Sequence, residues 1–367
     1  MRSSVAILGA GMMGIAIAAA HLRCGFSVLL YDSVDSVLQT ASQRIAQELQ
    51  LQKEAFNTSR LKLIRNIDDV HSCQIIIETI TEKRKLKQKL YRHLQQTAKG
   101  QTPYLFSNTS TISISGLAEV LEPDWRQQFC GFHFFHPVRQ RSLIEIIAGV
   151  ETVSATVTRA QEHAGLIEKQ SIMVGDHPGF LVNRILNFYL NSALMLLEEG
   201  VALDRIESIA TKFGMKIGPF HIMDEIGLDV VFHAGWVLYK AFPERIFNSS
   251  VLLKLVESGN LGRKTGCGFM LYPHKISWEG EGIPNPDLPP ISATDSNSNS
   301  NFDSDSDSNI SDDNIVQRLF VPMYEEAIRC RDEGVINDLA VADFASIHAL
   351  GFPPEKEGIV SWGMKNN

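Results

Sequence analysis

The sequence has few cysteines, which excludes two classes of site. It contains only Cys24, Cys73, Cys130, Cys267 and Cys330, an odd number with wide spacing and no CxxC pair. This usage is typical of reduced thiols in a cytoplasmic compartment. We therefore expect neither disulfides nor a zinc site.

An excess of positive charge is also missing. The formal net charge is -8, from 34 basic and 42 acidic residues. A protein that binds nucleic acid or an anionic membrane usually shows a basic balance or patch. We expect no nucleic-acid partner.

Long apolar runs are absent as well. The stretch VAILGAGMMGIAIAAA at 5–20 resembles a signal-peptide core, but glycines interrupt it and it is too short to span a bilayer. We expect no membrane span. The hydrophobic content of 44% over 367 residues is enough for two compact units.

Residues 4–35 read as a complete βαβ unit. Gly9 permits a tight turn, Gly11 lets the backbone approach a pyrophosphate, and Gly14 lets helix and strand pack closely. Asp32 ends the second strand, where its carboxylate can bind the adenosine ribose and repel a 2′-phosphate. A glycine turn without a ligand is the alternative. The order and spacing of the strand, the helix, the second strand and its terminal acid favour NAD binding.

The alternation of helices and strands then continues. We expect a helix near 34–56, a strand that ends at Glu78, a helix to about residue 97, and a strand over 104–108. The predicted fold class is α/β, a Rossmann-type doubly wound sheet followed by an all-α C-terminal domain. Glu78, Glu82 and Lys87 follow a strand end, the edge where such folds bind ligands. A solvated helix start would explain these charges equally well.

Two predicted strands carry a histidine and an acid. FCGFHF delivers His133, and SLIEIIAG delivers Glu145 twelve residues later. A buried carboxylate needs a partner, and an antiparallel strand pair can place the imidazole against Glu145. Such a pair is a general-base device, because the acid fixes the tautomer and stabilises the imidazolium. A structural histidine in a core pair is the alternative, and the neighbouring dinucleotide site favours catalysis.

Seven motifs together resemble one family: GAGMMG, SNTS, FHFFHPV, LIEII, DHPGFLVNRIL, GPFHIMDEIGLDV and GRKTGCGF. In order and spacing the chain is similar to the L-3-hydroxyacyl-CoA dehydrogenases over about residues 4–272. A weaker match over 314–363 resembles the second C-terminal domain of the multifunctional fatty-acid oxidation proteins, without their hydratase half.

The resemblance implies NAD-dependent oxidation of L-3-hydroxyacyl-CoA to 3-ketoacyl-CoA, or the reverse, in fatty-acid β-oxidation. It implies that His133 is the base, that Glu145 orients it, and that Ser110 and Asn183 hydrogen-bond the substrate. The cofactor-binding residues that we expect are Gly9, Gly11, Met13, Gly14, Asp32, Glu78, Glu82, Lys87 and Asn108. The resemblance implies that Glu78, Glu82 and Lys87 contact the cofactor ribose. The family usually has Asn where this chain has His136.

Three points stay open at this stage. The CoA-contacting segment between residues 50 and 70 cannot be mapped. A dehydrogenase of a free hydroxy or sugar acid on the same scaffold is one alternative function. A non-catalytic NAD-binding protein is the other.

Residues 183–219 recur at 317–353. With an offset of 134, Arg184 matches Arg318 and Gly200 matches Gly334, whereas Asn183 becomes Gln317. We predict four segments: an NAD-binding domain at 1–178, a helical domain at 179–280, an acidic Ser/Asp/Asn linker at 281–313, and a partial helical copy at 314–363. Single-copy members of the family dimerise through this helical domain. We expect the second copy to take the partner's place within the chain, with a homodimer as the alternative.

Overall fold

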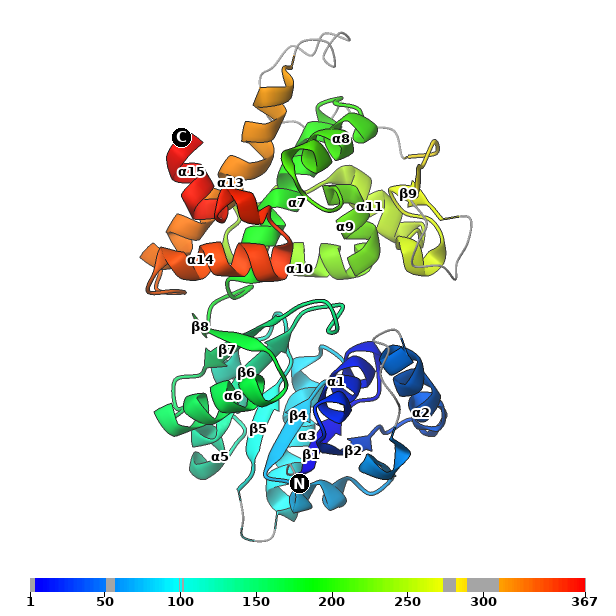
Figure 1. The fold of residues 1–367 in the computed structure, drawn as a ribbon, viewed down its shortest axis with the longest axis vertical. Coiled ribbons are helices and arrows are strands. Elements are labelled where there is room, and N and C mark those ends of the chain that lie inside the picture. Colours follow the sequence, from blue (N-terminus) through cyan, green and yellow to red (C-terminus); the bar gives the residue numbers. More distant parts are fainter. Residues whose placement is uncertain are drawn as a thin grey trace. The chain divides into compact units, whose positions relative to one another are not determined.

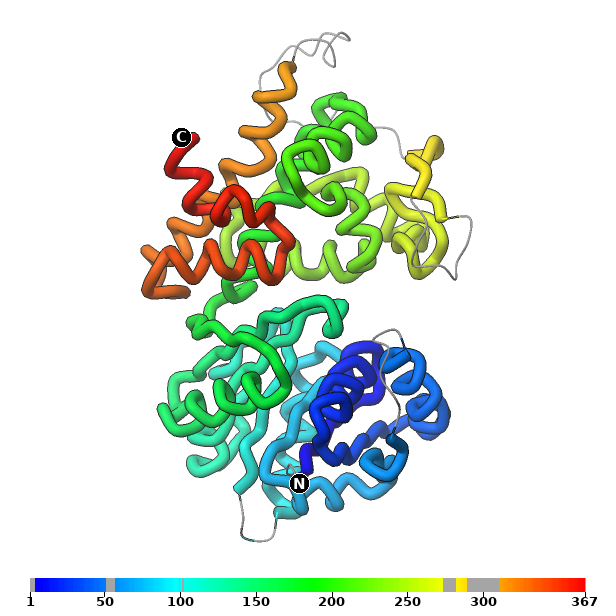
Figure 2. Tube along the Cα trace, viewed as in Figure 1, coloured from blue at the N-terminus to red at the C-terminus, as the bar shows by residue number. Residues whose placement is uncertain are grey.

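The computed structural model describes residues 4–50, 57–98, 100, 102–272, 282–288 and 310–366. The chain divides into two compact units, Met1–Phe180 and Leu181–Asn367. The first unit is built on one large sheet and the second is mainly helical (Figures 1 and 2). No helix in these ranges is long and apolar enough to cross a membrane.

The sheet of the first unit has eight strands in the order β3-β2-β1-β4-β5-β6-β7-β8. The strands are β1 (Ser4–Leu8), β2 (Ser27–Tyr31), β3 (Leu61–Ile64), β4 (Ile75–Glu78), β5 (Tyr104–Ser107), β6 (Phe129–Phe134), β7 (Leu143–Ala148) and β8 (Gln170–Gly175). β6 and β7 are antiparallel, and the other neighbours are parallel. The strand order reverses between β1 and β4, so the predicted doubly wound fold is confirmed.

Helices cover both faces of this sheet. The main hydrophobic core lies on one face, under α1 (Met12–Arg23), α2 (Asp35–Gln50) and α6 (Ser154–Leu166). The other face carries α3 (Arg84–Thr97) and α4 (Ile114–Ala118), and α5 (Pro123–Gln127) precedes β6. Because successive side chains of a strand point to opposite faces, Glu78, His133 and Glu145 share the α3 face.

The second unit is mainly helical, in agreement with the predicted all-α C-terminal domain. Its helices are α7 (Val182–Glu198), α8 (Leu203–Phe213), α9 (Pro219–Ile226), α10 (Leu228–Ala241), α11 (Ser250–Glu257), α13 (Asp312–Asp332), α14 (Leu339–Ala345) and α15 (Ile359–Asn366). A short antiparallel pair joins β9 (Met270–Leu271) and β10 (Ile283–Pro284). Most of the predicted linker at 281–313 lies outside the described residues.

The helices α7 and α13 pack against each other and end in the same way. Gly200 and Gly334 follow them with φ angles of 95° and 78°. Glycine adopts this left-handed conformation without strain, which suits a helix end followed directly by another helix. Tyr189 of α7 stacks on Phe320 of α13, with ring centroids 5.4 Å apart.

Candidate active site

The glycine turn between β1 and α1 is shaped by close packing on one side and open space on the other. A Cβ atom on Gly9 would lie 2.8 Å from the Thr79 carbonyl oxygen, and one on Gly14 would lie 1.8 Å from the Gly9 carbonyl oxygen. A Cβ atom on Gly11 would meet no described atom within 4 Å. Gly11 is the N-cap residue of α1, so the open space lies where backbone N–H groups favour an anion.

Asp32 holds this turn from the end of β2. Its carboxylate accepts hydrogen bonds from the backbone N–H groups of Ala10 at 2.7 Å and Val34 at 2.8 Å. Asp32 remains partly exposed, so it can also meet a ribose beside the turn. Met13, in the first turn of α1, packs against the hydrophobic core.

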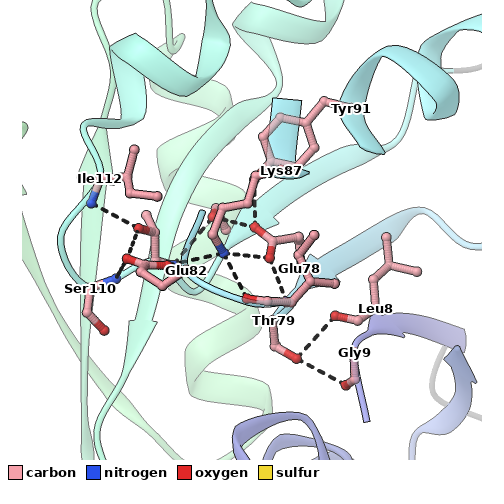
Figure 3. A network of polar contacts seen from close by, with 12 residues as sticks. Leu8, Gly9, Glu78, Thr79, Glu82, Lys87, Tyr91, Ser110 and Ile112 are labelled. Atoms are coloured by element: carbon pink, nitrogen blue, oxygen red, sulfur yellow. Dashed lines mark hydrogen bonds and ion pairs between the residues drawn. The ribbon is translucent and has the colours of Figure 1, made fainter. Parts of the chain in front are cut away.

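Glu78, at the end of β4, is completely buried and has both oxygens occupied. One oxygen accepts from Lys87 Nζ at 2.7 Å and from the Ile80 N–H at 2.7 Å. The other accepts from Tyr91 Oη at 2.6 Å and from Ser107 Oγ at 2.8 Å (Figure 3). Burial, and then the nearby Glu78 charge, raise the pKa of Tyr91 well above its ordinary value. Glu78 therefore ties α3 and β5 to the end of β4.

Glu82 lies four residues further on and faces the 109–111 turn that follows β5. Its Oε1 accepts from Thr109 Oγ1 at 2.6 Å, from the Ser110 N–H at 2.9 Å, and from the N–H and Oγ1 of Thr111, both at 3.0 Å. Its Oε2 lies 3.3 Å from Lys87 Nζ. Burial alone would raise the pKa of Glu82, but the Lys87 charge and these hydrogen bonds hold it below its ordinary value.

Ser110, His133 and Glu145 form a line of contacts within the first unit. His133 Nδ1 lies 2.7 Å from Glu145 Oε2, and His133 Nε2 lies 3.0 Å from Ser110 Oγ. The exposed fractions of His133 and Glu145 are 3% and 0%, so His133 is the partner that the buried acid requires. Asn108 fixes the end of β6, because its Oδ1 accepts from the Phe134 N–H at 2.8 Å.

His136 and Asn183 lie outside this line. His136 follows the end of β6, where burial, and then the charges of Arg139 and Arg141, lower its pKa. Asn183 lies in the first turn of α7, in the second unit. Its role toward a substrate stays a prediction.

Lys169 is a supporting residue that the sequence analysis missed. Its Nζ donates to the carbonyl oxygens of Val138 and Arg141, each at 2.6 Å, and so holds the loop between β6 and β7. An isolated lysine before a short strand gives no sequence signal for such a role. Burial, and then the charge of Arg23, lower the pKa of Lys169 to about 8.

Comparison with known families decides the class of this site. The NAD-binding domain model of 3-hydroxyacyl-CoA dehydrogenase matches residues 4–177, and the C-terminal domain model of the same family matches residues 179–272. The chain belongs to the 3-hydroxyacyl-CoA dehydrogenase family. This confirms the resemblance predicted from the seven motifs, and with it an NAD-dependent oxidoreductase.

Three solved structures are similar to this chain. (S)-3-hydroxybutyryl-CoA dehydrogenase PaaH1 from Ralstonia eutropha is 33% identical, with a TM-score of 0.67 over 74% of this chain and 99% of that chain. The dehydrogenase part of multifunctional enzyme 1 from C. elegans is 26% identical, with a TM-score of 0.64 over 96% and 80%. 3-Hydroxybutyryl-CoA dehydrogenase from Escherichia coli K12 is 23% identical and shares the fold, with a TM-score of 0.78 over 99% and 91%.

The residues around the glycine turn fit the NAD that this family binds. The open space beside Gly11 at the N-terminus of α1 suits a diphosphate, and Asp32 stands at the neighbouring strand end for the ribose. Glu78 and Lys87 are instead buried beneath the edge of the sheet, with exposed fractions of 0% and 1%. Their contact with the cofactor stays a prediction.

Proposed function

We propose that this 3-hydroxyacyl-CoA dehydrogenase oxidises an L-3-hydroxyacyl-CoA to the 3-ketoacyl-CoA, or catalyses the reverse, with His133 as general base. The observation that supports this most directly is the line from Ser110 through His133 to Glu145. It stands at the carboxyl edge of the sheet, where doubly wound folds bind their ligands. An imidazole with a carboxylate on Nδ1 and a hydroxyl on Nε2 is arranged to accept a proton at Nε2.

Each residue has a distinct task in this proposal. His133 Nε2 takes the proton of the 3-hydroxyl, and Glu145 stabilises the resulting imidazolium through Nδ1. Ser110 Oγ holds the substrate oxygen beside the base, and Asn183 is a second hydrogen-bond partner for the substrate. When bound, NAD supplies the acceptor for the hydride that leaves C3. A well-placed base contributes roughly 10²- to 10⁴-fold to the rate.

NADH formation tests the proposal. The substrates are L-3-hydroxybutyryl-CoA, longer 3-hydroxyacyl-CoAs and the corresponding free acids. His133→Ala is compared with His93→Ala, a matched control whose exposed imidazole also has a carboxylate partner, Asp68, at 3.2 Å. We expect thioester turnover to be lost in His133→Ala and kept in His93→Ala.

The other outcomes support the two alternatives. Turnover of free acids alone would support a dehydrogenase of free hydroxy or sugar acids. NADH binding without turnover of any of these substrates would support a non-catalytic NAD-binding protein.

We also propose that the second helical copy takes the place of a dimer partner within the chain. The support is that two equivalent ion pairs connect the α7 segment and the α13 segment. Arg184 contacts Glu333 at 2.8 Å, and Arg318 contacts Glu199 at 2.6 Å. The offset of 134 residues converts one pair into the other. Such reciprocal contacts are the hallmark of a two-fold interface between identical partners.

Sedimentation equilibrium tests this second proposal. We expect the mass of one chain at micromolar concentration, because α13 already covers the surface that a partner's α7 would use. A tight homodimer that persists on dilution would contradict the proposal.

The cellular location is a third proposal. We propose that the protein is cytoplasmic. The support is that the sequence has five cysteines, an odd number with wide spacing and no CxxC pair, a usage typical of a reducing compartment. Fractionation of cells that produce the protein, with immunodetection, tests this location.

A further inference from the structure

We infer that Glu82 is a positioning residue for Ser110, acting through the backbone of the 109–111 turn. Lys87 holds Glu82 in place through an ion pair. The inference rests on the proposed function, since Ser110 matters only if His133 is the base. It changes the role that the sequence suggested for Glu82, which was contact with the cofactor ribose.

The first argument is the number of hydrogen bonds that one carboxylate oxygen accepts. Four hydrogen bonds from three consecutive residues, Thr109, Ser110 and Thr111, converge on Glu82 Oε1. Thr109 Oγ1 also accepts from the Ile112 N–H at 3.1 Å, which closes the turn. A concave set of backbone N–H groups around an anion is a rigid arrangement. Glu82 therefore determines the shape of this turn.

The second argument is that Glu82 is itself held in place. Lys87 is buried and bridges Glu82 Oε2 at 3.3 Å and Glu78 Oε1 at 2.7 Å, and it also donates to the Ile80 carbonyl oxygen at 3.2 Å (Figure 3). A buried ammonium is tolerated only where its partners are in place. The position of Glu82 is thus fixed by a network anchored in β4 and α3.

The third argument is the position of Ser110 at the end of this chain of contacts. Its N–H is bound by Glu82, and its Oγ lies 3.0 Å from His133 Nε2. Backbone and side chain of one residue therefore connect the Glu82 carboxylate to the base. A displacement of about 1 Å at a reacting group can cost roughly 10²-fold in rate. Loss of Glu82 should act on the reaction through Ser110.

The test compares the His133 side chain in four forms of the full-length protein by NMR of its ring nitrogens. The variants are Glu82→Ala, Ser110→Ala and the double variant, with His133→Ala to assign the signal. We expect Glu82→Ala to shift the His133 resonances in the same direction as Ser110→Ala, and the double variant to add nothing further. Unchanged His133 resonances in Glu82→Ala would overturn the inference.

Three further variants control for folding and chemistry. Glu82→Gln keeps an oxygen that can accept the same hydrogen bonds, so it should restore most of the wild-type His133 signal. Thr111→Val removes one hydroxyl donor and leaves the charges intact, so it should give a smaller shift in the same direction even if Glu82→Ala does not fold. Glu151→Ala is the matched control, because its carboxylate pairs with Arg126 at 2.9 Å on the surface. It should leave His133 unchanged.

Kinetics and cofactor binding separate this role from a ribose contact. We expect kcat of Glu82→Ala to fall about 10- to 100-fold, as for a displaced group, with the Kd of NADH within about twofold of wild type. A Kd of NADH raised more than about tenfold with unchanged His133 resonances would establish a ribose contact instead.

If the wild-type protein turns over no thioester, the proposed function fails. The NMR comparison would still decide the role of Glu82.

Discussion

His133 and Glu145 are directly opposite each other on the antiparallel strands β6 and β7, and their side chains meet at 2.7 Å. Both residues are buried, so the carboxylate has little competition from water for the imidazole. The acid can thus hold one tautomer of His133 and stabilise its protonated form. This pairing makes a specific prediction for the acid.

Glu145→Gln should lower kcat by about 10²- to 10⁴-fold, because an amide can bond to Nδ1 but cannot stabilise the imidazolium by charge. NADH affinity should stay within about twofold of wild type, since Glu145 does not face the glycine turn. Steady-state kinetics and NADH fluorescence titration check both statements. A kcat within twofold of wild type would show that Glu145 is only structural.

This hairpin could be predicted from the sequence because the information is local. Twelve residues separate His133 from Glu145, and the alternation of apolar side chains along each strand fixes which face each one takes. The role of Glu82 could not be predicted. Its partners Thr109 to Thr111 follow a different strand. How the segment after β4 lies against the segment after β5 depends on tertiary packing. The charges near Glu82 fitted a solvated helix start equally well.

The second unit shows the same limit. The matching glycines and arginines indicate a repeated helical segment, and both Gly200 and Gly334 indeed end a helix with positive φ. The repeat itself does not say which residue of one copy meets which residue of the other. The reciprocal Arg184–Glu333 and Arg318–Glu199 contacts appear only once α7 and α13 pack together.

The two glycines of the first turn should respond differently to alanine. Gly14→Ala places a methyl group 1.8 Å from the Gly9 carbonyl oxygen, so the turn must move and thermal stability should fall. Gly11→Ala meets no described atom, so stability should be kept while the methyl group enters the space for the diphosphate. Differential scanning fluorimetry and NADH titration measure the two effects. Equal NADH affinity in Gly11→Ala and wild type would place the diphosphate elsewhere.

His136 should not contribute to the pH dependence of catalysis. Its pKa lies below the ordinary value, because burial and the charges of Arg139 and Arg141 disfavour the cation, so the side chain is neutral at about pH 7. His136→Asn replaces one neutral side chain by another. We expect the acid limb of the profile of kcat/KM against pH to keep its position. A displaced limb would mean that His136 titrates in the working range.

The ion pairs of the helical unit should differ strongly in how much each contributes to the free energy of unfolding. Arg184 and Glu326 are both fully buried, so Glu326→Ala leaves a buried guanidinium with less compensation and should destabilise the fold by about 3–5 kcal/mol. Arg318 and Glu199 are about one third exposed, so Glu199→Ala should cost about 0–1 kcal/mol. Urea denaturation of both variants gives the comparison. Equal losses would show that burial does not control these pairs.

A buried histidine pair connects α1 to α6. His21 Nε2 lies 2.9 Å from His163 Nε2, and His21 Nδ1 lies 2.7 Å from the Ile17 carbonyl oxygen. Because the carbonyl only accepts, Nδ1 of His21 carries the proton and Nε2 accepts from His163. A proton added to His21 Nε2 would set two N–H groups against each other. A proton added to His163 would go to its Nδ1 and place a positive charge in a buried site near Arg159. Both rings are therefore neutral in the folded protein at about pH 7.

This pair should make the fold sensitive to acid. Burial lowers the pKa of His21 from 6.5 to about 4, and burial followed by the charges of His21 and Arg159 lowers that of His163. Between about pH 6.5 and pH 4 the unfolded chain binds protons that the folded chain cannot, so the free energy of unfolding falls as the pH falls. For His21 alone the full loss is about 3 kcal/mol, and it is absent above about pH 6.5.

Urea denaturation at about pH 7, 5.5 and 4.5 measures this loss. The double variant His21→Leu/His163→Leu replaces both rings by apolar side chains, so no unpaired polar group is left behind. It should lose less stability on acidification than wild type, by about 3 kcal/mol or more between the highest and lowest pH. His93→Ala, which removes an exposed imidazole, should keep the wild-type slope. The same slope in the double variant would assign acid sensitivity to carboxylates such as Glu82, whose pKa is lowered in the fold and whose protonation also destabilises it.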